Sequence, residues 1–411
     1  MIIIITIGSG PPTKSEPTKG ITSSQSGLGT AGIKVGSLPT SIAVNPKTNK
    51  LYVTYGFSNK VSVLDGNTGN RLNTIRIGHY PHIVVIDPYT NTIYVTNGGS
   101  DTISVIDGDT DTLMDPITIH GKPAYISINP VTHILSVTNT ISNKVSMIDS
   151  YTNSIVANDT LPGGYGSNVV VNPVTNRVYI ASPDSNVVSV IDLQSNKIVT
   201  EIPVGKMPEG MAINPVSGIV YVANYLSNTL SLIDGRDDKI IADIIGLGKH
   251  PIGLGVNPIT NTVYVTYSGS NSVSVINTPI IEGTIRYKAI ANITVGVYPS
   301  SVAVNPNTDM VYVVNTNSNT ISVINGTSNT VVVGVNFETE PSNLGDIQCN
   351  GQMISNNITT FVSYGEELAC SAITLTQNEK LTGSKSLDEF LWSIHDVFAG
   401  GILFDLAGLE M

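Results

Sequence analysis

The chain has 411 residues, of which only 12% are charged, and its formal net charge is -11. A protein that grips phosphates needs a basic face, so we expect no nucleic-acid partner. The hydrophobic content of 41% argues against a disordered chain, and no apolar run reaches the ~18 residues of a membrane span.

The first thirty residues differ from the rest of the chain. Residues 1–7 are apolar, but no Lys or Arg precedes them and the run stops at Gly8. This pattern predicts either the remnant of a signal peptide or a disordered start. Residues 8–30 are rich in Pro, Gly, Ser and Thr, which is typical of a linker.

From residue 31 to about 335 the chain repeats one unit, which is marked by an Asn-Pro or Asp-Pro step. The prolines of this step are Pro46, Pro88, Pro130, Pro173, Pro215, Pro258 and Pro306. Their spacings are 42, 42, 43, 42, 43 and 48 residues. A fixed period in this range, built from strands, predicts a propeller, and seven copies predict seven blades.

Each unit contains four strand-like runs, which we name a to d. In the first unit they are residues 41–44, 52–54, 62–65 and 74–78. They are rich in Val, Ile, Thr and Tyr, which fit a pleated surface packed on both faces. The sequence therefore predicts an all-β fold of seven four-stranded antiparallel blades.

The turns between these strands carry a second repeated signal. One aligned position in the a–b turn is occupied by Asn49, Asn91, His133, Asn176, Gly218, Asn261 and Asp309. The c–d turn has Gly69, Asp111, Asn153, Asn196, Asp238 and Asn329 at its own aligned position. Most of these residue types accept positive φ at low cost, so we expect left-handed turn residues at both places. Every b–c turn carries Ser-Asn or Ser-Asp, which predicts side-chain bonds to the turn backbone.

Strand b carries Tyr-Val-Thr-Asn at 94–97, with close copies at 221–224 and 312–315. With these motifs in phase with the turns, the chain resembles the YVTN β-propeller repeat family over residues 31–335. Residues 136–139 and 179–182 depart from the motif. That family includes archaeal surface-layer proteins, so the resemblance implies a seven-bladed propeller, often on the cell exterior. It implies no single activity.

The two ends of the repeat region predict how the ring closes. Residues 32–36 align with strand d, so we expect them to supply the outer strand of the last blade, while residues 330–337 lead out of the ring. Residues 336–411 predict a small β and helical appendage. It holds a β-rich piece with the disulfide candidates Cys349 and Cys370, and a helix from about 387 to 398.

The d–a and b–c loops open on one face of a propeller, and their residues vary between blades while the strands repeat. Variable, aromatic-rich loops on a rigid scaffold favour binding. The candidate binding residues are Tyr55, Phe57, Tyr80, His82, Lys122, Tyr165, Glu209, Tyr225, His250, Tyr267 and Tyr298. We interpret the chain as a non-catalytic surface or secreted scaffold that binds a protein or a glycan, with no cofactor.

The alternative is a metal-assisted hydrolase or lyase, similar to a lactonase, at the channel mouth. Its motifs are incomplete. Asp107, Asp109 and Asp111 have the spacing of a calcium loop but lack its Gly and distal Glu. His79, His82, His120 and His250 lie in d–a loops, but not all of their blade junctions are neighbours. We therefore predict a plain turn at the three aspartates and a protein that is not an enzyme.

Overall fold

The computed structural model describes residues 32–160, 166–281 and 284–332, and the backbone of four short strands between 347 and 372. Every regular element in this part of the chain is a β-strand. The described residues include no helix that is long and apolar enough to cross a membrane. The predicted N-terminal segment, the helix at 387–398 and the side chains of Cys349 and Cys370 lie outside the described residues.

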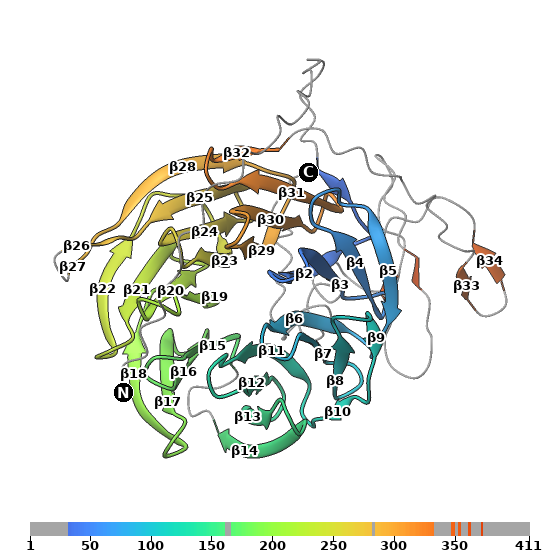
Figure 1. Ribbon diagram of the computed structural model, residues 1–411, viewed down its shortest axis with the longest axis horizontal. Coiled ribbons are helices and arrows are strands. Elements are labelled where there is room, and N and C mark those ends of the chain that lie inside the picture. Colours follow the sequence, from blue (N-terminus) through green and yellow to red (C-terminus); the bar gives the residue numbers. More distant parts are fainter. Residues whose placement is uncertain are drawn as a thin grey trace, which may run out of the picture. The chain divides into compact units, whose positions relative to one another are not determined.

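Seven antiparallel sheets surround a common centre, and strand a of each sheet lies innermost (Figure 1). Blade 1 consists of β2 (Pro39–Val44), β3 (Lys50–Tyr55), β4 (Lys60–Asp65) and β5 (Arg71–Arg76). Blade 2 consists of β6 (Pro81–Asp87), β7 (Thr92–Asn97), β8 (Thr102–Asp107), β9 (Thr112–Leu113) and β10 (Ile117–Thr118). Its outer strand is split in two where Pro116, which has no N–H to donate, interrupts the ladder.

The next three blades are regular. Blade 3 consists of β11 (Pro123–Ile128), β12 (Ile134–Asn139), β13 (Lys144–Asp149) and β14 (Ser154–Thr160). Blade 4 consists of β15 (Asn168–Asn172), β16 (Arg177–Ser182), β17 (Val187–Asp192) and β18 (Lys197–Pro203). Blade 5 consists of β19 (Pro208–Ile213), β20 (Ile219–Asn224), β21 (Thr229–Asp234) and β22 (Lys239–Ile244).

Blade 6 explains the one long spacing in the repeat. It consists of β23 (Pro251–Asn257), β24 (Thr262–Tyr267), β25 (Ser272–Asn277) and β28 (Lys288–Thr294). Between its last two strands the chain inserts a hairpin of β26 (Ile280–Ile281) and β27 (Thr284–Ile285). Later in the sequence, β33 (Ile347–Cys349) pairs with β34 (Gln352–Ile354), and β35 (Phe361–Val362) pairs with β36 (Ser371–Ala372).

Blade 7 draws strands from both ends of the repeat region. It contains β29 (Pro299–Asn305), β30 (Met310–Asn315) and β31 (Thr320–Asn325). The outer position beside β31 is shared by β1 (Ile33–Lys34) and β32 (Thr330–Val331). The expected closure by residues 32–36 is therefore confirmed. The expectation that the chain leaves the ring from Thr330 was wrong for the first two residues, because they still pair with β31; residues 333–337 lie outside the described part.

The apolar core is divided among the blade junctions. The buried residues form seven clusters, and each cluster joins two neighbouring blades. The cluster between blades 7 and 1 contains Ile33, Tyr55 and Tyr312. Both faces of every sheet are thus covered, which is why strands b and c are buried at almost every position.

The Tyr and Asn of the four-residue motif have separate structural tasks. The tyrosine hydroxyl bonds to the c–d turn of the next blade in Tyr52–Asp111 (2.7 Å), Tyr94–Ser150 (3.1 Å), Tyr179–Gly235 (3.2 Å) and Tyr312–Gly66 (2.9 Å). The asparagine amide donates to a serine on strand c of its own blade in Asn97–Ser104, Asn139–Ser146, Asn224–Ser231 and Asn315–Ser322. The motif is therefore explained by packing and hydrogen bonding within the fold.

Candidate functional site

The d–a loops are fixed by the b–c turns on both sides. In six blades strand a begins with a proline, such as Pro39 in blade 1, which we call the aligned proline. The Asn or Asp of the preceding blade's b–c turn accepts a bond from the N–H of the residue before this aligned proline. The pairs are Leu38–Asn319, Tyr80–Asn59, Lys122–Asp101, Met207–Asn186, His250–Asn228 and Tyr298–Asn271, at 2.7–3.3 Å. One residue earlier, the N–H bonds to a serine of the following blade in His79–Ser100, Lys206–Ser227, Lys249–Ser270 and Val297–Ser318.

These bonds hold the residue before the proline in a left-handed conformation. The φ angle there lies between 51° and 56° in six blades. None of the six residues is Gly, Asn or Asp, so each conformation costs about 1–2 kcal/mol in isolation. The repeated hydrogen bonds offset that cost and give every variable loop residue the same backbone direction. The left-handed residues predicted for the a–b and c–d turns also have positive φ, including His133 at 59°. The Asn or Asp of the b–c turns has positive φ as well, which was not predicted from the sequence.

Four of the predicted binding residues form two aromatic pairs at separate blade junctions. Phe57 and Tyr80 meet edge to face, with ring centroids 5.8 Å apart, and Phe57 is 56% exposed. Tyr225 and His250 are stacked, with centroids 4.6 Å apart. Each pair joins a b–c turn to the next d–a loop, so both lie on the predicted face. Sequence reasoning missed Ile141, which is exposed at the position aligned with Phe57.

Other predicted residues lie elsewhere. Tyr55 and Tyr267 end β3 and β24 and are buried between blades at the position of the motif asparagine, so placing them in the loops was wrong. Tyr298 is also buried, whereas Lys122 is exposed on the loop face. Tyr165 lies outside the described residues. Tyr55 aligns with Asn97, the last residue of the strand b motif in blade 2. This alignment is the sequence signal that predicts a buried strand residue at Tyr55 and not a loop residue.

Two predicted residues directly after the aligned proline are ionisable groups in unusual surroundings. Glu209 is 6% exposed, and burial, followed by the charge of Asp184, raises its pKa to about 8. His82 is half-buried as a residue, but its ring packs against Tyr125 at 4.9 Å and burial lowers its pKa to about 4. Both side chains are therefore neutral near pH 7. They come from blades 2 and 5, and the structure shows no contact between them.

The features that suggested a metal site are distributed among separate partners. Asp107 accepts backbone bonds inside its turn, Asp109 accepts from Asn91, and Asp111 pairs with Lys50 at 2.7 Å. Of the loop histidines, His79 contacts Asn59, while His82 and His250 pack on tyrosines. Residues 32–160, 166–281 and 284–332 contain no group of three or more metal-binding side chains.

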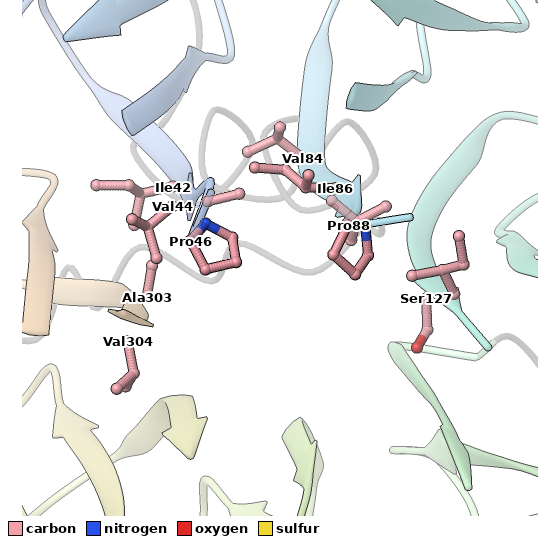
Figure 2. A pocket seen from close by; sticks show the side chains of 12 residues that line it. Ile42, Val44, Pro46, Val84, Ile86, Pro88, Ser127, Ala303 and Val304 are labelled. Carbon is pink, nitrogen blue, oxygen red and sulfur yellow. The ribbon is translucent and has the colours of Figure 1, made fainter. Parts of the chain in front are cut away.

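A hollow of about 380 Å³ lies in the ring's centre (Figure 2). It is bordered by the inner strands β2, β6, β11 and β29 and by Pro46 and Pro88 of two a–b turns, so it lies away from the d–a loops. Of its lining residues only Ser127 has a polar side chain. Such a lining offers no nucleophile with a base and no paired acids.

Comparisons with known proteins reveal the fold. No family model matches the chain, and a search of curated proteins gives no match. A hydrazine synthase chain from Kuenenia stuttgartiensis superposes with a TM-score of 0.62 at 19% identity, covering 74% of this chain and 99% of that chain. A chain of the mitotic checkpoint complex superposes with a TM-score of 0.61 at 12% identity, covering 79% and 98%. Together with the sheet order, these likenesses establish a seven-bladed β-propeller.

Proposed function

We propose that this chain is a non-catalytic binding scaffold of the YVTN type, acting at the cell surface or as a secreted protein. Its propeller binds a protein partner through the face formed by the d–a loops and b–c turns. The repeat motifs support the YVTN assignment, and the family's frequent position on the cell exterior supports the location. The propeller fold itself suits a scaffold.

One observation carries the proposal. On this face a repeated set of hydrogen bonds fixes the loop backbone, whereas the side chains on it vary between blades. Exposed apolar residues protrude from the rigid turns at Phe57, Ile141 and Leu226. Apolar and aromatic groups on a preorganised frame lose little conformational entropy on binding, which favours a protein interface.

The test uses substitutions that the chain itself supplies. A triple variant, Phe57→Asn, Tyr80→Lys and Leu226→Asn, places at each position a residue that another blade carries there, namely Asn317 and Lys122. Tagged wild-type and variant proteins are used to capture partners from cell-surface and secreted fractions. We expect the wild type to capture a protein that the variant does not, at equal melting temperatures. Equal capture by both proteins would refute the loop face as the binding site.

A further inference from the structure

The ring has seven junctions between neighbouring blades, and the residues at one junction can be compared with those at the others. On the face opposite the d–a loops, the asparagine of the Asn-Pro step bonds to the turn residue of the next blade. The pairs are Asn45–Asn91, Asn129–Asn176, Asn214–Asn261, Asn257–Asp309 and Asn305–Asn49, at 2.6–3.0 Å. A pair of short polar side chains is therefore sufficient for the fold at this place.

The junction of blades 2 and 3 is built differently. The buried carboxylate of Asp87 accepts bonds from His133 Nδ1 and Ser150 Oγ, both at 3.2 Å. Its other oxygen accepts from the N–H of Tyr89 at 2.9 Å. Because a carboxylate only accepts, the Nδ1 of His133 is the donor in this bond. The His133 ring is thereby held in one orientation.

Two exposed tyrosines cover this imidazole. The Tyr89 ring lies 4.8 Å from the His133 ring and the Tyr151 ring lies 4.7 Å from it, centroid to centroid. The tyrosine rings are nearly perpendicular, at 84° and 6.4 Å, and form what we call the tyrosine corner. Tyr89 is 72% exposed and Tyr151 is 59% exposed. The corner thus rests on a buried polar pair and presents aromatic surface to solvent.

The fold does not require these residues. At the position of Tyr89 the other blades carry Lys47, Val131, Val174, Val216, Ile259 and Asn307. At the position of Tyr151 they carry Asn67, Asp109, Gln194, Arg236, Pro279 and Thr327. Asp87, His133 and Ser150 also depart from the usual residue at their positions. Five departures from the repeat, spread over 65 residues of sequence, meet in one cluster, which indicates a purpose other than folding.

The surroundings of the corner are acidic. Asp149, two residues before Tyr151, caps the same turn by accepting the N–H of Tyr151 at 2.8 Å. Partial burial, then Tyr89 and the charges of Asp87 and Asp149, raise the pKa of Tyr151. A negative potential over two aromatic faces favours a cation, because the ring quadrupole and the carboxylates attract it together.

We propose that the tyrosine corner binds an organic cation, the guanidinium or ammonium group of a basic side chain on a protein partner. A protein is the source because a small ligand needs a site that encloses most of its surface, which two rings this exposed do not provide. Tyrosine is also enriched among the residues that dominate protein interfaces. This site is independent of the loop face, since it lies on the other end of the blades.

The direct test is a titration of the full chain, labelled with ¹³C in its tyrosine rings, with N-acetyl-arginine amide followed by NMR. We expect saturable shifts in two tyrosine signals, those of Tyr89 and Tyr151. The first signal is identified by its absence from the spectrum of Tyr89→Val, and the second by its absence from the spectrum of Tyr151→Gln. Each of these variants should bind about fivefold more weakly, as expected for the loss of one cation–π contact of about 1 kcal/mol. Val and Gln are the residues of blades 3 and 4 at these positions, so both variants should fold, and Tyr151→Phe should bind like the wild type.

Three further titrations distinguish the alternatives. N-acetyl-citrulline amide has the shape of the arginine probe without its charge, and equal binding of both would refute a cation site. A neutral disaccharide that shifts the same signals at lower concentration would refute it in favour of a glycan platform. Free choline that binds more tightly than the arginine amide would refute a protein side chain as the source. Asp149→Asn, which retains the turn cap as Asn325 does in blade 7, should weaken arginine binding.

Discussion

The backbone N–H of Leu38 donates a 2.7 Å hydrogen bond to the side-chain oxygen of Asn319, a residue 281 positions away. Within one repeat, the backbone N–H of Tyr80 donates the same kind of bond to the side-chain oxygen of Asn59. On the opposite face, Asn305 reaches Asn49 at 2.6 Å across the same junction. Blades 7 and 1 are therefore joined by the bonds that join the other blades, and the ring has no special seam at these places.

Asn319→Ala should measurably weaken the ring. The substitution removes the bond to Leu38 and places Ala at a φ of 54°, and together these effects should lower the free energy of unfolding by about 2 kcal/mol. Asn319→Asp is the matched control, because Asp101 makes the same bond in blade 2. Chemical denaturation of the three proteins measures the difference. Equal losses in both variants would contradict the role given to the side-chain oxygen.

Closure by the N-terminal strand can be tested at two adjacent residues. Ile33 is buried in the cluster between blades 7 and 1, whereas Lys34 is exposed. Ile33→Ala should cost about 2–4 kcal/mol, and Lys34→Ala should cost less than about 0.5 kcal/mol. Deleting residues 1–36 should lower the melting temperature by several degrees. An unchanged melting temperature would show that β32 alone closes the blade.

The repeat predicts the architecture because each structural requirement recurs seven times. The 42-residue spacing fixes the blades, and residues such as Asn49 and Asp111 mark the left-handed turns because their side chains tolerate positive φ. Tyr80 has the same backbone conformation without any such signal. Its conformation is imposed by Asn59 and Ser100 in the turns on either side, which local propensity cannot reveal.

The candidate sites were harder to predict because they depend on which blades are neighbours. The exposed Phe57 and Tyr80 were predicted on the loop face, and the aligned loop positions are enough to place them. Tyr89 and Tyr151 were missed because they lie 62 residues apart and meet only across a blade junction. Their departure from the repeat is visible in the sequence, but its meaning requires the position of His133.

Breaking the Asp87–His133 pair from one side should cost more stability than replacing both residues together. His133→Ala leaves a buried carboxylate without one of its partners and should cost about 3 kcal/mol. The double variant Asp87→Asn and His133→Asn recreates the amide pair of Asn45 and Asn91, and should lie within about 1 kcal/mol of the wild type. Equal losses in the two variants, measured by chemical denaturation, would mean that the cost does not come from a carboxylate left without its partner.

Glu209 should make the protein less stable as the pH rises. Its pKa is about 8 in the folded protein and near the ordinary value of 4.5 in the unfolded chain. Below pH 4.5 both states are protonated, and between pH 4.5 and 8 only the unfolded state loses its proton. The free energy of unfolding should therefore fall by about 1.4 kcal/mol per pH unit in this range from this group.

Glu209→Gln provides the comparison for that pH profile. The variant has the same shape and cannot ionise, so it should match the wild type at pH 4 and exceed it in stability at pH 8. Melting temperatures measured across this range test the difference between the two proteins. If the melting temperatures of the two proteins change with pH in the same way, the carboxyl group of Glu209 is in contact with solvent and the prediction is wrong.

The most direct test of the account is to determine which end of the blades touches the partner. Leu226 and Arg236 are both exposed in blade 5, at the b–c turn and at the c–d turn respectively. A photo-crosslinking amino acid is placed at each position in turn, and the protein is exposed to the partner that the wild type captures and the triple variant does not. We expect cross-links from position 226 and none from position 236. Cross-links from position 236 alone would contradict binding through the loop face.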